Sequence, residues 1–208
     1  MRLLIVFLLI VSIFANEEKF TLEVSSQIHE SKSVSFIAHS GTGAFDSYLI
    51  LNLPYKHVKK VYDDLQVKLE KTLKNRGEAH ITVITPPEYY NQLRNYISIE
   101  EINEIAKDMK IQNARFDIIC IGRGEKKIDG KKEHTYYIVV ESLDLRNIRK
   151  KIWDLYVERG GDPQKFNAER YYPHITLGFT RRDLHESDGI IKDRKSLFAF
   201  LVEAKQEK

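Results

Sequence analysis

Apolar positions in the first half of the chain follow first the pattern of a strand and then that of a helix. An apolar run over residues 48–53 predicts a buried strand. After Pro54, aliphatic residues recur every three or four positions, which predicts an amphipathic helix that ends near residues 75–77. Its buried face consists of Val58, Val61, Leu65, Leu69 and Leu73. The next strand carries His80 and ends at Pro86.

The second half repeats this order. Residues 116–121 and 135–140 predict the two strands of a hairpin around a polar, basic tip at 122–132. A helix with apolar positions at Leu145, Ile148, Ile152 and Leu155 follows, and the next strand carries His174. Both halves therefore read strand, helix, strand. We expect an α+β fold of two pseudo-symmetric lobes, each an antiparallel sheet with packed helices, with the active-site cleft between them.

Two shorter segments complete the pattern. A helix is predicted after Ser98, whose side chain can cap it in a capping box with Glu101. Residues 196–202 form a last apolar run, and its pattern fits a strand and a helix equally well.

The predicted strands that carry His80 and His174 share a tetrapeptide, histidine-isoleucine-threonine-aliphatic. Because alternate side chains of a strand share a face, His80 and Thr82 point one way, and His174 and Thr176 do the same in the second copy. Each strand then presents an imidazole and a hydroxyl on one face and packs its aliphatic residues into the core. The alternative is that two unrelated buried strands match by chance.

Two imidazoles and two hydroxyls around one cleft suit the chemistry of a phosphodiester. Opening a cyclic phosphate needs a base on the attacking oxygen and an acid on the leaving oxygen. Histidine fits both roles because its ordinary pKa of about 6.5 keeps both protonation states populated near neutrality. Threonine hydroxyls can donate to the non-bridging oxygens, where charge lies in the transition state. The symmetry of the two copies leaves open which histidine is the acid.

Three neighbours of the second motif are candidate substrate-binding residues. Tyr172 and Gly178 share the face of His174, where the tyrosine can stack on a base and the glycine leaves room for a ligand. Arg181 follows the strand and can meet phosphate, although solvation at the surface is the ordinary role of such a residue.

At these motifs the chain resembles the two-histidine (2H) phosphoesterase superfamily, over about residues 45–203. Residues 172–180 (YPHITLGFT), followed by Asp183, Leu184, His185 and Glu186, resemble its Swiss Army Knife RNA repair-like branch. The resemblance implies a phosphodiesterase that acts on a 2′,3′-cyclic phosphate, a 2′-5′ linked RNA end or a small nucleotide. The implied catalytic residues are His80, Thr82, His174 and Thr176. Two alternatives stay open, a nucleotide- or RNA-binding module without turnover and a 2′-5′ ligase-like enzyme that joins RNA ends.

Composition narrows the partners. The 208 residues carry a net charge of only +3 with both signs mixed, which favours a small ligand or strand end over extended nucleic-acid binding. The sequence lacks zinc and di-metal motifs, so we expect neither metal nor cofactor. The single cysteine, Cys120, excludes an intramolecular disulfide. We expect a monomer.

The first 15 residues have the form of a secretory signal peptide, a basic start followed by a short apolar run. The pattern predicts cleavage near Ala15 and a secreted protein without stable membrane association; an uncleaved signal that anchors the chain is the alternative. We divide the chain into the signal at 1–15, an N-terminal extension at 16–44 and the 2H phosphoesterase domain at 45–208, formed by the two lobes.

Overall fold

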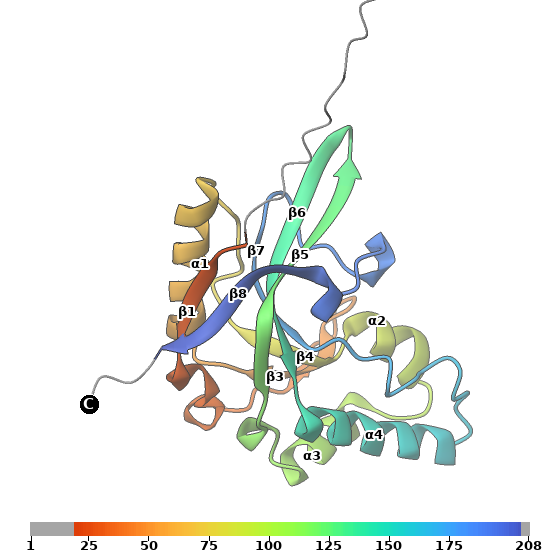
Figure 1. Cartoon of the computed structure of the whole chain (residues 1–208). Coiled ribbons are helices and arrows are strands. Elements are labelled where there is room, and N and C mark those ends of the chain that lie inside the picture. Colours follow the sequence, from red (N-terminus) through yellow and green to blue (C-terminus); the bar gives the residue numbers. More distant parts are fainter. Residues whose placement is uncertain (1–18, 205–208) are drawn as a thin grey trace, which may run out of the picture.

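Two β-sheets, whose edge strands β4 and β7 contact each other, form the centre of the computed structural model, which describes residues 19–204 (Figure 1). The larger sheet has the order β1-β8-β5-β6-β7, and the smaller has the order β2-β3-β4. Only the β1–β8 pair in them is parallel. The α+β class is confirmed. The larger sheet comprises β1 (Thr21–Ser25), β5 (Asp117–Ile128), β6 (Lys131–Glu141), β7 (His174–Phe179) and β8 (Leu197–Ala204), and the smaller comprises β2 (His39–Ser40), β3 (Ser47–Asn52) and β4 (His80–Ile84).

The helices connect the two lobes. Helix α1 (Tyr55–Leu69) packs against β1 and β7, whereas α4 (Leu143–Glu158) packs against β4. Each long helix therefore contacts the motif strand of the other half of the chain. Helix α3 (Ile99–Asp108) lies beside α4 and β3, at the lower end of the molecule in Figure 1, and the short α2 (Pro86–Glu88) follows β4. One hydrophobic core consequently contains buried residues from both lobes.

Helix α1 is shorter than its apolar pattern predicts. Val58, Val61 and Leu65 are buried as expected, but the helix ends at Leu69. Glu70 takes a left-handed conformation with φ of 49°, which ends the helix. Leu73 is buried beyond that end, in the segment that returns to β4. At α3 the predicted capping box is present: the Ser98 hydroxyl accepts from the Glu101 amide, and the Glu101 carboxylate accepts from the Ser98 amide.

The predicted polar loop at 122–132 is wrong, because β5 and β6 continue to a two-residue turn. Asp129 and Gly130 form the turn with positive φ values of 49° and 81°, the backbone that a type I′ hairpin requires. An ion pair of 2.9 Å between Lys132 and Glu125 joins the two strands near the tip. This hairpin projects from the body of the molecule (Figure 1).

The N-terminal extension belongs to the folded body over the residues that the structure describes. β1 adds an edge strand to β8, which is the strand formed by the final apolar run. The side-chain amide of Gln112 donates to the carbonyl oxygens of Ser31 and Val34 and so ties this segment to the domain. The proposed signal at 1–15 lies outside the described residues. Within residues 19–204, no helix is both long and apolar enough to cross a lipid bilayer.

Candidate active site

The motif strands β4 and β7 are held together from both sides. Lys74, ahead of β4, exchanges two backbone hydrogen bonds with Phe179 of β7, at 2.8 and 2.9 Å. The Tyr171 hydroxyl, ahead of β7, donates to the Thr82 carbonyl oxygen of β4 at 3.1 Å. These bonds fix one motif strand relative to the other, and the segments that make them lie just outside the motifs.

Burial alternates along both strands as predicted. Ile81 and Ile175 have no exposed surface, whereas the histidines and threonines beside them are half-buried. A pocket between the lobes is lined by Arg76, Glu78, His80 and Thr176. The lining therefore combines residues of both halves. Arg76 was not predicted as a site residue; its guanidinium brings a permanent positive charge to the pocket.

His80 has a carboxylate as its nearest charged neighbour. The Glu78 carboxylate lies 3.6 Å from Nδ1 of His80, and Nδ1 is buried without a hydrogen-bond partner in the part of the chain that the structure describes. Burial lowers the pKa of His80 below the ordinary histidine value. Glu78 acts in the opposite direction, because a negative charge favours the imidazolium. Burial is the larger of the two effects, and Glu78 partly offsets the decrease in the pKa of His80.

His174 has a cation as its nearest charged neighbour. Its Nδ1 donates to the Tyr172 carbonyl oxygen at 2.8 Å, and its Nε2 lies 3.1 Å from Nζ of Lys192. Burial, together with the Lys192 ammonium, lowers the pKa of His174 to about 3. The ring of Tyr137, on β6, packs edge-on against this imidazole with 5.7 Å between ring centroids.

Asp183 connects the cation to the rest of the second motif. Its carboxylate accepts from Lys192 at 2.9 Å, from the Thr135 hydroxyl at 2.6 Å and from the Thr176 hydroxyl at 3.3 Å. Burial alone would raise the pKa of Asp183, but Lys192 and Thr135 hold it below its usual range. Asp183 therefore stays ionised and orients both a motif threonine and the lysine that meets a motif histidine.

The comparisons with known proteins are consistent with this geometry. A family model described as "Swiss Army Knife, 2H phosphoesterase domain" matches residues 47–185. The chain belongs to this 2H phosphoesterase family. The match contains both motif strands and Asp183 and stops before Lys192. No curated protein and no solved structure matched the chain.

The three further residues that the sequence suggested for substrate binding occupy different places in this 2H phosphoesterase domain. Tyr172 lies two residues before the first residue of β7, and its carbonyl oxygen accepts a hydrogen bond from His174. Arg181 points toward the hairpin, where its guanidinium bonds to Asp129 at 2.6 Å. The structure therefore brings Tyr172 to the second histidine but places Arg181 on the hairpin side, away from the residues that line the pocket.

The space beside Gly178 is occupied by protein. A Cβ atom at this position would lie 2.9 Å from the Lys74 carbonyl oxygen and 3.0 Å from the Tyr62 ring of α1. The glycine thus permits the close approach of the first half of the chain to β7, and the expected room for a ligand is filled by that segment. Its effect on the site is indirect, through the position of β7.

Asp183 and Lys192, like Arg76, are site residues that the sequence analysis did not predict. Asp183 lies seven residues after Thr176, and Lys192 lies on the long loop between β7 and β8. Strand alternation cannot place either side chain, because both follow the end of the strand. The signal that was available is the acidic residue closely after the motif, which the family match also includes.

Proposed function

We propose that the protein is a phosphodiesterase that hydrolyses a 2′,3′-cyclic phosphate or a 2′-5′ linkage at an RNA end or in a small nucleotide, without a metal. The observation that carries the proposal is that His80 of one half and Thr176 of the other line one pocket together with Arg76. Membership of the 2H phosphoesterase family supports the reaction class. The substrate class is inferred from the chemistry of the site.

The pocket fits an anion that reacts by proton transfer. Arg76 supplies positive charge to the pocket, and His80 is part of its lining. His80 and His174, on the two motif strands that contact each other, are the groups that exchange protons with the attacking and leaving oxygens in this proposal. The hydroxyl of Thr82 has no hydrogen-bond partner among residues 19–204 and is free to donate to a phosphate oxygen. In the same described part of the chain, no cluster of three or more His, Cys, Asp or Glu side chains could hold a metal ion.

Mass spectrometry of a short oligoribonucleotide with a 2′,3′-cyclic phosphate tests the proposal. Hydrolysis adds one water to the substrate, and EDTA leaves the rate unchanged. We expect His80→Ala and His174→Ala each to lower kcat about 10²- to 10⁴-fold, the range typical of general acid-base groups. His57→Ala on α1, outside the pocket lining, is the matched control and keeps the wild-type rate.

The same measurement separates the alternatives. A binding module leaves the mass of the oligonucleotide unchanged while the protein still retains it, and a ligase-like enzyme yields a joined product. Wild-type turnover in either motif-histidine variant, with the fold intact by circular dichroism, contradicts the proposed mechanism.

A further inference from the structure

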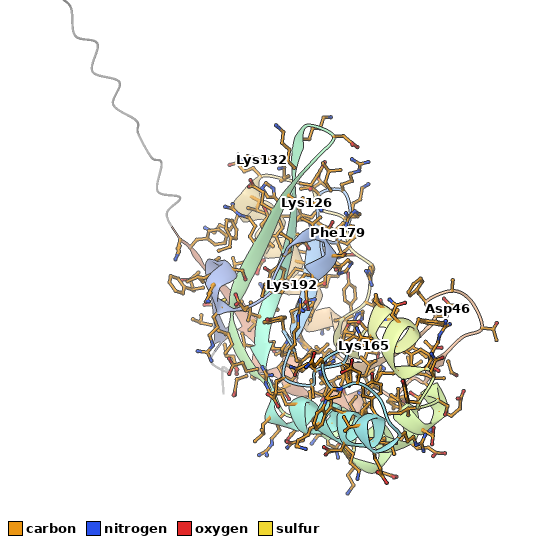
Figure 2. All side chains as sticks on the ribbon, turned by 90° about the vertical axis from the view of Figure 1, so that its right-hand side faces the viewer. Asp46, Lys126, Lys132, Lys165, Phe179 and Lys192 are labelled. Carbon is orange, nitrogen blue, oxygen red and sulfur yellow. The ribbon has the colours of Figure 1, made fainter. Side chains whose placement is uncertain are left out.

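Lys192 is a buried cation that contacts a motif histidine. Its side chain is only 4% exposed, and its Nζ lies between Nε2 of His174 and the carboxylate of Asp183. It is a buried residue and lies below the projecting part of the hairpin, where Lys132 is labelled (Figure 2). Charged side chains are rarely buried unless they are paired, so this placement calls for an explanation beyond surface solvation.

The hydrogen bonds of His174 define where its protons lie. A carbonyl oxygen only accepts, so Nδ1 carries the hydrogen in its bond to Tyr172. Nε2 faces the lysine and accepts from it. Burial lowers the pKa of Lys192, and Asp183 opposes that decrease. The proton belongs to Lys192, because burial lowers the pKa of His174 as well and the ordinary pKa of lysine exceeds that of histidine by about four units. Asp183 at 2.9 Å and the Tyr137 ring, 5.2 Å from Nζ, both stabilise that charge.

The remaining groups around His174 do not reverse this assignment. Burial raises the pKa of Tyr137, on β6, to about 12, so it is uncharged near neutrality. Nδ1 of His185 lies 3.9 Å from the Asp183 carboxylate. Burial lowers the pKa of His185, so this imidazole is neutral as well. Asp183 favours a proton on His174, but its carboxylate binds the Lys192 ammonium directly.

His80 lies in the opposite electrostatic setting. The carboxylate of Glu78, 3.6 Å away, favours its protonated form, and Asp183 acts in the same sense. Arg76 and His39 act against protonation of His80. Burial lowers the pKa of His39 itself. The nearest charged group is therefore negative at one motif histidine and positive at the other.

We propose that Lys192 is a positioning residue: by donating to Nε2 it keeps His174 unprotonated, which makes His174 the general base and leaves His80 as the general acid. This inference rests on the proposed function for its catalytic meaning. Lys192 is neither in a motif strand nor within residues 47–185, which match the family. The two sequence motifs do not show which histidine is the acid, and in this proposal Lys192, which lies outside both motifs, decides it.

The roles define one balanced step. The phosphate oxygens compete for the Lys192 ammonium as the substrate enters, which frees the Nε2 lone pair. Water attacks phosphorus and forms the new P–O bond while its proton passes to Nε2 of His174. The P–O bond to the ribose oxygen breaks, and His80 gives its proton to that oxygen. The step starts with a charged His80 and a neutral His174 and ends with the reverse.

NMR titration of the histidine side-chain nitrogens in the substrate-free protein tests the inference directly, with His174 assigned by the signal that His174→Gln loses. In the wild type we expect an unprotonated Nε2 that persists well below pH 6.5. In Lys192→Met the midpoint of the His174 titration rises by about one pH unit or more, the shift expected when a like charge at hydrogen-bond distance is removed. Lys192→Gln, which keeps a donor without the charge, gives the same rise and replaces Lys192→Met if that variant does not fold.

Lys126→Met is the matched control. Lys126, on β5, forms a 2.9 Å ion pair with Asp188, which lies on the same long loop as Lys192. Lys126 does not contact His174, so removing its charge leaves the midpoint of the His174 titration unchanged. An Nε2 that is protonated at pH 7 in the wild type, or an unchanged midpoint in both Lys192 variants, overturns the inference.

Turnover supplies an independent readout. The rising, acid-side limb of the kcat/KM profile reports the base in the free enzyme, and in Lys192→Gln it moves to higher pH together with the NMR midpoint. If no cyclic phosphate is hydrolysed by any form, the proposed function fails, while the NMR result still decides whether Lys192 controls the protonation of His174. If the wild type turns over but the limb stays in place, His174 is not the base.

Discussion

Among the described residues, one buried cation contacts each motif strand, and the two cations bind different kinds of partner. Arg149 of α4, 1% exposed, donates to the Val83 carbonyl oxygen of β4 at 2.6 Å and pairs with Glu88 at 2.9 Å. Its other contacts are carbonyl oxygens and aromatic rings of the chain ahead of β7. Lys192 also binds a carboxylate, but its second partner is the ring nitrogen of His174.

The difference separates a structural cation from one that acts on chemistry. The planar guanidinium of Arg149 has five donors in fixed directions, and its partners are backbone carbonyl oxygens, aromatic rings and one carboxylate. Lys192 meets an imidazole, whose protonation can change. The repeat supplies two equivalent histidines, but of these two cations only Lys192 contacts a histidine, so the surroundings of His80 and His174 are unequal.

The largest effect that distinguishes the two cations is on stability. Arg149→Met leaves Glu88 without its partner and the Val83 carbonyl oxygen without its donor. Breaking a buried ion pair from one side costs about 3–5 kcal/mol, so we expect a loss of this size in the free energy of unfolding, measured with urea.

Lys150→Met, at the next position of α4, is the control. Lys150 forms an exposed pair with Asp154, and such pairs contribute about 1 kcal/mol or less. Equal stability of the two variants means that Arg149 does not hold β4 in place.

The site residues differ in how far the sequence could predict them. Strand periodicity placed His80 and Thr82 on one face, because their directions follow from alternation alone. It could not place Lys192, whose position depends on the path of a long loop. It also predicted that Gly178 leaves room for a ligand. That prediction was wrong because the Lys74 backbone packs against Gly178, and this contact forms only when the two halves of the chain associate.

The elements of the fold show the same limit. Apolar spacing found α4 within a few residues of its ends, but it extended α1 to residues 75–77, past the observed end at Leu69. It read the hairpin tip as a loop, since charged side chains outweighed the Asp129-Gly130 turn signal, which is local and specific. The parallel pairing of β1 with β8 joins the two ends of the described chain, and no periodicity within either strand specifies such a partner.

The two motif threonines test whether the halves are also unequal in their hydroxyls. The Thr82 hydroxyl has no partner among the described residues, whereas that of Thr176 donates to Asp183. We expect Thr82→Val to lower kcat by about 10²-fold, as for the loss of one donor to a transition-state oxygen, with stability unchanged within about 0.5 kcal/mol.

Thr176→Val, in contrast, loses activity and about 1 kcal/mol of stability as well, because Asp183 loses a hydrogen bond. Kinetics and urea unfolding of both variants measure the difference. A stability loss in Thr82→Val that matches the loss in Thr176→Val would show that the two hydroxyls are equivalent.

The smallest effect concerns Glu78 and sharpens the comparison between the histidines. As the general acid, His80 must be protonated, so activity falls as pH rises through its pKa. Glu78 raises that pKa, and Glu78→Gln therefore lowers it and moves the falling limb of the kcat/KM profile to lower pH. The rate on the alkaline side drops a few-fold at most, since an ion pair with one exposed partner contributes about 1 kcal/mol or less, and salt weakens the effect. Glu104→Gln, on an exposed position of α3, leaves the profile in place. Because Lys192, and not Glu78, controls His174, the rising limb stays where it is; a rising limb that moves in Glu78→Gln would mean that His80 is the base and that the roles of the two halves are reversed.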